Sequence, residues 1–118
     1  NPDGTDGFGQ YRAGWEMPVH QLLVKNNVTA VFHGHDHIFA KQDLDGIVYQ
    51  CLSQPGAKER GNTRNGEEYG YLTGEIRNAP GYMRVKVDSD KVAFEFVKTD
   101  IRDITNNKSI LFQYQIKK

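Results

Sequence analysis

The apolar residues near the N-terminus recur at helical spacing. Val19, Leu22 and Leu23 lie at positions i, i+3 and i+4, and Pro18 directly precedes them. This spacing predicts one short amphipathic helix over about residues 17–26, ended by two consecutive asparagines. The first fifteen residues contain four glycines and predict irregular loop.

After the helix the pattern changes to that of strands. Residues 28–32, with the sequence VTAVF, are apolar without alternation, which is typical of a strand buried on both faces. The segments 38–43 and 47–52 then flank the pair Asp45-Gly46. Because Asp-Gly between two apolar runs favours a tight turn, this region predicts a β-hairpin.

A polar, glycine-rich stretch over 53–80 follows, and we expect it to form a long loop that is either functional or mobile. Beyond it, apolar and polar residues alternate. This alternation predicts strands over 81–88, 91–99 and 109–117, with a hairpin at 88–90. The residues expected to face the core are Val92, Phe94 and Phe96 in one strand and Ile110, Phe112, Tyr114 and Ile116 in the next.

Composition and charge exclude several classes of function. The chain has 15 basic and 15 acidic residues, and this balance excludes binding to nucleic acid through a broad basic field. No apolar run approaches the roughly 20 residues of a membrane helix, so we expect a soluble chain without a membrane partner. Cys51 is the single cysteine, which excludes an internal disulfide and a cysteine-based zinc site. The compartment, export included, stays open.

The predicted core is small for the length of the chain. Hydrophobic residues make up 37% of 118 residues, and one helix with about six strands leaves at least one sheet face without a cover. Both observations predict that the chain is a portion of a larger domain. Uncovered sheet surface also leads us to expect self-association of the isolated chain.

Three of the four histidines lie close together, at His33, His35 and His37. Alternate residues of extended chain point to one side, about 6.5–7 Å apart. Two imidazoles at this spacing can clamp one metal ion after local bending, or each can bind one of two ions about 3.5–4 Å apart. Gly34 lacks a Cβ, which allows the backbone to bend there. The fourth histidine, His20, is expected to be a surface or core residue of the helix.

The segment Gly34-His35-Asp36-His37 follows an apolar strand and continues as IFAKQDLDGIVYQ. It resembles the last metal-binding motif, G-H-x-H, of the calcineurin-like metallophosphoesterases. The wider stretch 15–54, together with GYMRVKVDSDKVAFEFVKTD, resembles the C-terminal third of bacterial members of that superfamily.

The resemblance implies an α/β (α+β) fold, a two-sheet metallophosphatase-type β-sandwich flanked by helices. Residues 1–118 would be its mostly β C-terminal portion with one short helix. Within it, residues 1–53 would lie at the active-site side, 54–80 would form the long loop, and 81–118 would supply strands of the second sheet.

The resemblance also implies a function, the hydrolysis of phosphoesters by two divalent metal ions (Zn, Fe, Mn or Ni). His35 would bind one ion and His37 the other, with Gly34 shaping the turn. The family's earlier motifs, D-x-H, G-D-x-x-D and G-N-H, do not occur in this sequence. The remaining ligands and the catalytic acid would therefore come from the missing N-terminal part of the same domain, and this chain alone is expected to be inactive.

Several further residues are candidates for the surroundings of such a site. A histidine ligand normally donates its second N–H to a carboxylate or a carbonyl, and three carboxylates lie nearby in the sequence. Arginine suits bidentate binding of phosphate, so the long loop could face the substrate. The candidates are Asp36, Asp43 and Asp45 for the carboxylate, His33 as a packing residue or a neighbour of the ligands, and Arg60 with Lys58, Arg64, Tyr69 and Tyr71 for the substrate.

The histidine cluster also bears on two other functions. Metallohydrolases of the β-lactamase type use H-x-H-x-D-H, and the stretch beginning at His33 is one residue too short, which places its Asp36 on the wrong side of an alternating backbone. A non-enzymatic β-rich module for metal binding or protein interaction stays open, because two histidines rarely hold a metal ion alone.

Overall fold

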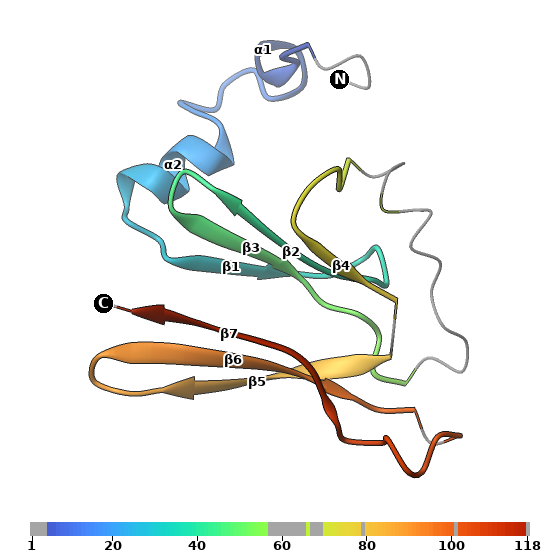
Figure 1. The fold of residues 1–118 in the computed structure, drawn as a ribbon. Helices are drawn as coiled ribbons and strands as arrows, with labels where there is room; N and C mark the ends of the chain where they lie inside the picture. Colours follow the sequence, from blue (N-terminus) through green and yellow to red (C-terminus); the bar gives the residue numbers. More distant parts are fainter. Residues whose placement is uncertain (1–4, 57–65, 67–69, 79, 101, 118) are drawn as a thin grey trace.

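The computed structural model describes residues 5–56, 66, 70–78, 80–100 and 102–117. This part of the chain is mostly β, with short helices near the N-terminus (Figure 1). The elements in these ranges are α1 (Phe8–Tyr11), α2 (Val19–Lys25), β1 (Ala30–His33), β2 (Phe39–Leu44), β3 (Ile47–Cys51), β4 (Glu75–Arg77), β5 (Gly81–Val87), β6 (Lys91–Lys98) and β7 (Ile110–Lys117).

The strands form two sheets. The first has the order β1-β3-β2-β4, in which β1 runs parallel to β3 and the other neighbours are antiparallel. The second is the antiparallel meander β5-β6-β7. The predicted β2–β3 hairpin is confirmed, because Leu44 pairs with Ile47 across a turn whose Asp45 and Gly46 have φ of 49° and 79°. Two positive φ values are the requirement of a type I′ turn, which Asp-Gly meets at little cost.

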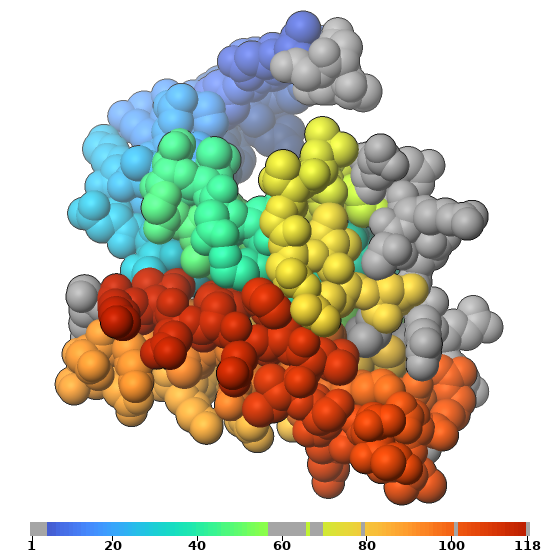
Figure 2. Space-filling view, in the orientation of Figure 1, coloured from blue at the N-terminus to red at the C-terminus, as the bar shows by residue number. Residues whose placement is uncertain are grey.

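One part of the core lies between the two sheets, which pack face to face (Figures 1 and 2), and a second cluster of Ile38, Ala40 and Cys51 packs with Tyr71 and Ile76. The ring of Phe39 stacks on Phe96 with centroids 4.3 Å apart, and both residues are fully buried. Gln50 is also fully buried, and its amide donates to the carbonyls of Ala40 at 3.2 Å and Cys51 at 2.9 Å. From the second sheet, the hydroxyl of Tyr114 donates to Oε1 of Gln50 at 3.1 Å. A buried amide with its hydrogen bonds made therefore joins the sheets in addition to the stacked rings.

The first strand differs from its prediction. It begins at Ala30 rather than at residue 28, and it is an edge strand of the described sheet. Its residues are only partly buried, and the side chain of Phe32 is 45% exposed. The expectation of a strand buried on both faces is therefore wrong for the described part of the chain, where β3 is the single neighbour of β1.

Three further expectations need correction. A short helix, α1, forms within the predicted N-terminal loop, and β4 forms within the long loop predicted over 53–80. Ile110 was expected beside Phe112 on the core face, yet it is 44% exposed. A register shift in β7 removes Ile110 from the face of Phe112, because Phe112 pairs with Phe96 whereas Ile110 pairs with the adjacent residue, Val97.

The predicted helix is present as α2, but its apolar residues are less buried than expected. Neither α1 nor α2 contains a buried residue, and Val19 and Leu22 are 51% and 48% exposed. Leu23 and His20 turn toward the first sheet instead. Within the described ranges, no helix has the length and apolar character needed to cross a lipid bilayer.

The outer face of the second sheet is polar. The register places Arg84, Glu95 and Gln113 side by side, followed by Lys86 and Gln115. Arg84 donates from Nε to Glu95 at 2.6 Å. A polar face of an antiparallel sheet can remain in contact with water.

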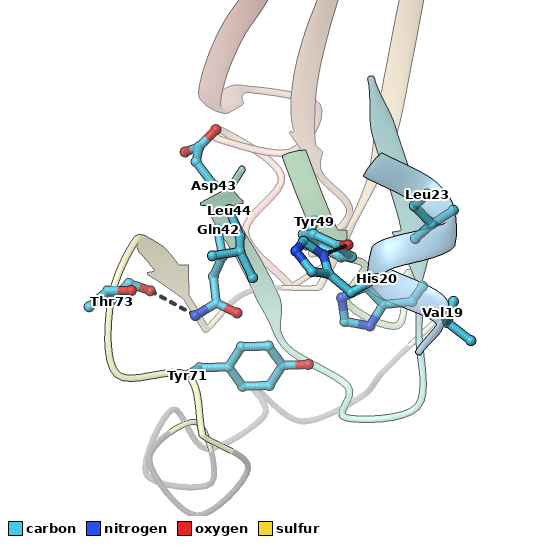
Figure 3. Close-up of a pocket in the computed structure, with 10 residues that line it drawn as sticks. Val19, His20, Leu23, Gln42, Asp43, Leu44, Tyr49, Tyr71 and Thr73 are labelled. Atoms are coloured by element: carbon cyan, nitrogen blue, oxygen red, sulfur yellow. Dashed lines mark hydrogen bonds between the residues drawn. The ribbon is translucent and has the colours of Figure 1, made fainter. Parts of the chain in front are cut away.

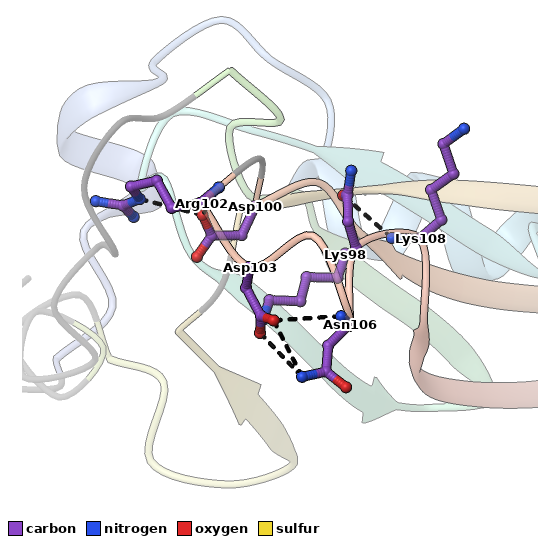
Figure 4. Close-up of polar contacts among 7 residues, drawn as sticks. Lys98, Asp100, Arg102, Asp103, Asn106 and Lys108 are labelled. Carbon is purple, nitrogen blue, oxygen red and sulfur yellow. Dashed lines mark hydrogen bonds and ion pairs between the residues drawn. The ribbon is translucent and has the colours of Figure 1, made fainter.

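Charged side chains hold the connection between β6 and β7 (Figure 4). Lys98, mostly buried at the end of β6, donates from Nζ to Asp103 at 2.6 Å. Asn106 also donates to Asp103, from its backbone at 3.2 Å and from its side chain at 3.1 Å. Arg102 donates from Nε to Asp100 at 3.1 Å. The hydrogen bond from Lys98 lowers the pKa of Asp103. The hydrogen bond from Arg102 lowers the pKa of Asp100.

We expect acidification below about pH 4 to destabilise the fold. The pKa of Asp103, Asp100 and Glu95 is lowered in the folded chain, in the last case first by the hydrogen bond from Arg84. In that range the unfolded chain binds more protons than the folded chain, so each added proton favours unfolding. Urea unfolding at a series of pH values measures how the free energy of unfolding falls with acidification. In Asp103→Asn that fall should be smaller, because one of the carboxylates with a lowered pKa is absent. A free energy of unfolding that stays constant to about pH 2.5 would contradict the expectation.

Candidate metal centre

The histidine cluster lies where two parallel strands end. Residues 34–38 connect the end of β1 to the start of β2 and pass over the end of β3. His33 pairs with Cys51 across the two parallel strands, and the N–H of Leu52 donates to the carbonyl of His33 at 2.9 Å. The segment therefore occupies the carboxyl edge of the parallel pair, the position at which α/β sheets bind ligands.

The backbone of the segment is a turn and not a continuation of the strand. His35 has φ of 99° and His37 has φ of 57°, both in the left-handed region that residues with a Cβ rarely adopt. The spacing expected from extended chain does not apply to such a backbone. Gly34 was expected to provide the bend, but its φ is not positive and a Cβ there would meet no atom within 4 Å. The positive φ values thus occur at the two histidines and not at the glycine.

Asp36 connects this turn to the segment before β4. One carboxylate oxygen, Oδ2, accepts a hydrogen bond of 2.5 Å from the hydroxyl of Tyr71, and the other, Oδ1, lies 3.0 Å from Nδ1 of His35. The side chain of Asp36 is 16% exposed, whereas that of His35 is 89% exposed. The carboxylate is therefore held between a fixed tyrosine and an imidazole that faces solvent.

The pKa shifts of this pair agree with its geometry. The hydrogen bond from Tyr71 lowers the pKa of Asp36, although burial opposes the change. Burial, followed by the hydrogen bond to Asp36, raises the pKa of Tyr71. Tyr71 therefore stays a protonated donor and Asp36 an ionised acceptor throughout the neutral range.

A cavity of about 600 Å³ lies beside the turn, on the face of the first sheet that points away from the second sheet (Figure 3). His33 faces this cavity, and its ring stacks on Tyr71 with centroids 6.4 Å apart. His33 therefore packs against Tyr71 at the wall of the cavity. The cavity is lined by Val19, His20, Leu23, His33, Gln42, Asp43, Leu44, Tyr49, Tyr71 and Thr73.

Of the three candidate carboxylates, Asp36 alone contacts a predicted ligand in the described part of the chain. Asp45 lies 2.9 Å from Nε2 of His20, whose Nδ1 is 2.7 Å from the hydroxyl of Tyr49. Asp43 is paired with Lys41. Through these two contacts His20 links α2 to the β2–β3 hairpin. This is a structural role, as expected for a surface or core residue of the helix.

The substrate candidates are mostly outside the described residues. Arg60, Lys58, Arg64 and Tyr69 all belong to that group. Tyr71 is described, and its contact with Asp36 was not anticipated. No sequence pattern joins two residues 35 positions apart in a region predicted as loop, so this contact required the structure.

The described residues do not gather a set of metal ligands by themselves. Among the ranges that the structure describes, no three His, Cys, Asp or Glu side chains gather closely enough to hold an ion. The side chain of His35 is 89% exposed, and His37 is exposed as well. Neutral imidazoles suit zinc, iron and nickel, so the donor type fits the implied ions while the number of donors requires ligands from elsewhere.

Comparisons with known proteins add no assignment. No protein-family model matches the chain, and no curated protein sequence matches it.

Proposed function

We propose that this chain is the C-terminal part of a metal-dependent phosphoesterase of the calcineurin-like kind, to which it supplies the last two histidine ligands, His35 and His37. One observation carries the proposal: a Gly-His-Asp-His turn, with both ligand candidates in left-handed conformation, lies at the carboxyl edge of two parallel strands. Such rare backbone conformations cost about 1–3 kcal/mol each and concentrate at functional sites.

The side chains suit this role individually. His35 extends into solvent from a turn anchored through Asp36, so its ring can meet ligands contributed by another segment. Bound divalent ions would lower the pKa of a water molecule and neutralise charge on the phosphoryl oxygens, which is the chemistry that phosphoester hydrolysis needs. Imidazole ligands leave more positive charge at the site than carboxylates would, which favours binding of an anionic phosphate.

The rest of the proposed domain would cover surface that the described residues leave open. Trp15, Val19 and Leu22 are each about half exposed, and they lie on the N-terminal segment beside the first sheet. The cavity between α2 and Tyr71 is adjacent to this apolar surface. Exposed apolar residues in such number mark an interaction surface, and we propose the N-terminal part of the same domain as its partner.

Hydrolysis by the longest natural chain that carries this sequence tests the proposal. We expect turnover of p-nitrophenyl phosphate or of its bis-ester, loss of turnover on chelation, and recovery with Zn²⁺, Mn²⁺ or Ni²⁺. Turnover that is insensitive to chelation would contradict the metal mechanism. No turnover with any of these ions would favour a non-enzymatic metal-binding module, which the small number of gathered ligands in the described ranges also allows.

A further inference from the structure

We infer that the open edge of β1 pairs with a further β-strand, an extended segment with apolar residues at alternate positions, and that this strand packs over β5. The inference rests on the proposed function for the source of the strand, which is the N-terminal part of the same domain. It gives that part a defined contact with this chain, on the opposite side of the first sheet from β4.

The backbone of β1 has one side without a partner strand in the described part of the chain. The carbonyls of Thr29 and His33 accept hydrogen bonds of 3.0 Å and 2.9 Å from backbone N–H groups of β3 and of the residue that follows it. Successive residues of a strand direct their backbone groups to alternate sides. The N–H and C=O groups of Ala30 and Phe32 therefore point away from β3, toward the open edge.

The edge of β1 lacks the features that keep an edge strand unpaired. Exposed edges of natural sheets usually carry charged residues, prolines or bulges. β5, an edge strand of the second sheet, follows this rule with the exposed residues Arg84 and Lys86. β1 has the sequence AVFH, which contains no Lys, Arg, Asp, Glu or proline, and its register with β3 is continuous. The edge of β1 therefore suits a partner strand, whereas the edge of β5 suits water.

The contacts between the sheets show what lies opposite the open edge. Phe39 of β2 packs on rings of β6 and β7, whereas Phe32 of β1 packs on Phe94 of β6, with centroids 5.9 Å apart. A step from β2 toward β1 in the first sheet thus corresponds to a step from β7 toward β6 in the second sheet, and β5 comes next. Because β1 ends the described part of its sheet, β5 extends past it.

The part of β5 that extends past β1 is apolar and uncovered. Val85 pairs with Phe94 and Val87 pairs with Val92, so both valines belong to the face that is directed at the first sheet. Phe94 is 3% exposed, whereas Val85 is 42% and Val87 is 71% exposed. These valines continue the interface between the sheets to the place where a strand beside β1 would lie. One strand with apolar residues on its inner side would therefore complete both the backbone edge and the apolar face.

Hydrogen exchange of individual amides tests the inference without any measurement of activity. In the longest natural chain that carries this sequence, the amides of Ala30 and Phe32 should exchange about 100-fold or more slowly than in residues 1–118 alone, since amides inside a sheet open less often than amides at its edge. The amides of Val31 and His33 face β3 and serve as the internal reference, because they should exchange slowly in both chains.

Val87→Asp and Ile104→Asp form a matched pair of variants. Val87 lies on the uncovered face of β5, whereas Ile104, which is 84% exposed, lies on the connection between β6 and β7. In the longest natural chain, Val87→Asp should speed exchange at Ala30 and Phe32 by about tenfold or more, because the added strand would bury the new carboxylate. Ile104→Asp should leave exchange at both amides unchanged.

The outcomes separate this inference from the proposed function. Fast exchange at Ala30 and Phe32 in the longest natural chain overturns the inference, even if that chain hydrolyses phosphoesters. Protection that grows with protein concentration also overturns it, because a second copy then closes the edge. If Val87→Asp leaves the protection intact, the strand does not pack over β5 and the inference falls as well. Conversely, protection that is independent of concentration, in a chain without hydrolysis, supports the added strand and removes the phosphoesterase assignment.

Discussion

Phe39→Ala is expected to lower the free energy of unfolding by about 3–5 kcal/mol. The Phe39 ring is fully buried, stacks on Phe96 at 4.3 Å and meets the edge of Phe112 at 5.7 Å. Its removal would leave a cavity between the sheets that neither sheet can close without moving. A loss of this size is a fifth or more of the roughly 5–15 kcal/mol by which domains are stable, so the variant is expected to unfold at a clearly lower temperature or urea concentration.

The control is Phe32→Ala, which removes the same side chain from the same face of the same sheet. Phe32 is 45% exposed and touches one ring, Phe94, at 5.9 Å, so its loss should cost about 1 kcal/mol. Urea unfolding of both variants gives the difference. Equal losses would mean that Phe39 does not occupy a shared core, and the packing of the two sheets would have to be revised.

If the proposed function holds, His35→Ala and His37→Ala should each lower kcat/KM of the longest natural chain that carries this sequence by more than about 100-fold. Residues that only orient a ligand are already worth about 10–100-fold, and loss of the ligand itself should exceed that. Each variant should also bind fewer metal ions, as measured by elemental analysis after dialysis. The fold should change little, because both side chains are exposed and leave the turn for solvent.

His20→Gln provides the matched control for these variants. His20 has two hydrogen-bond partners, Asp45 and Tyr49, and lies apart from the turn, so its replacement should affect stability and not metal content. Near-normal hydrolysis by both His35→Ala and His37→Ala would exclude these imidazoles as ligands. A loss of activity equal to that of His20→Gln would instead indicate a general effect on folding.

Local patterns predicted most of the elements because their signals lie within a few residues. The Asp45-Gly46 turn, helix α2 and the strands of the second sheet all have such signals. The burial of β1 could not be predicted, since an apolar run has the same appearance in a central strand and in an edge strand. The register shift that exposes Ile110 depends on pairing with β6, which the sequence of β7 alone does not contain.

The candidate site was predicted in part for the same reason. The histidine spacing is local, and it led directly to the turn after β1. The contact between Asp36 and Tyr71 depends on how the chain returns to β2 through Gly74, and no pattern within the turn indicates it. For Gly34 the sequence-based expectation was wrong. The glycine was expected to bend the backbone, whereas the unusual φ values occur at His35 and His37.

Anomalous diffraction at a metal absorption edge, from crystals of the longest natural chain grown with Zn²⁺ or Mn²⁺, tests the assignment of the turn most directly. We expect two neighbouring peaks, one within bonding distance of an imidazole nitrogen of His35 and the other within bonding distance of His37. Ions bound elsewhere, with both of these rings free of metal, would contradict it.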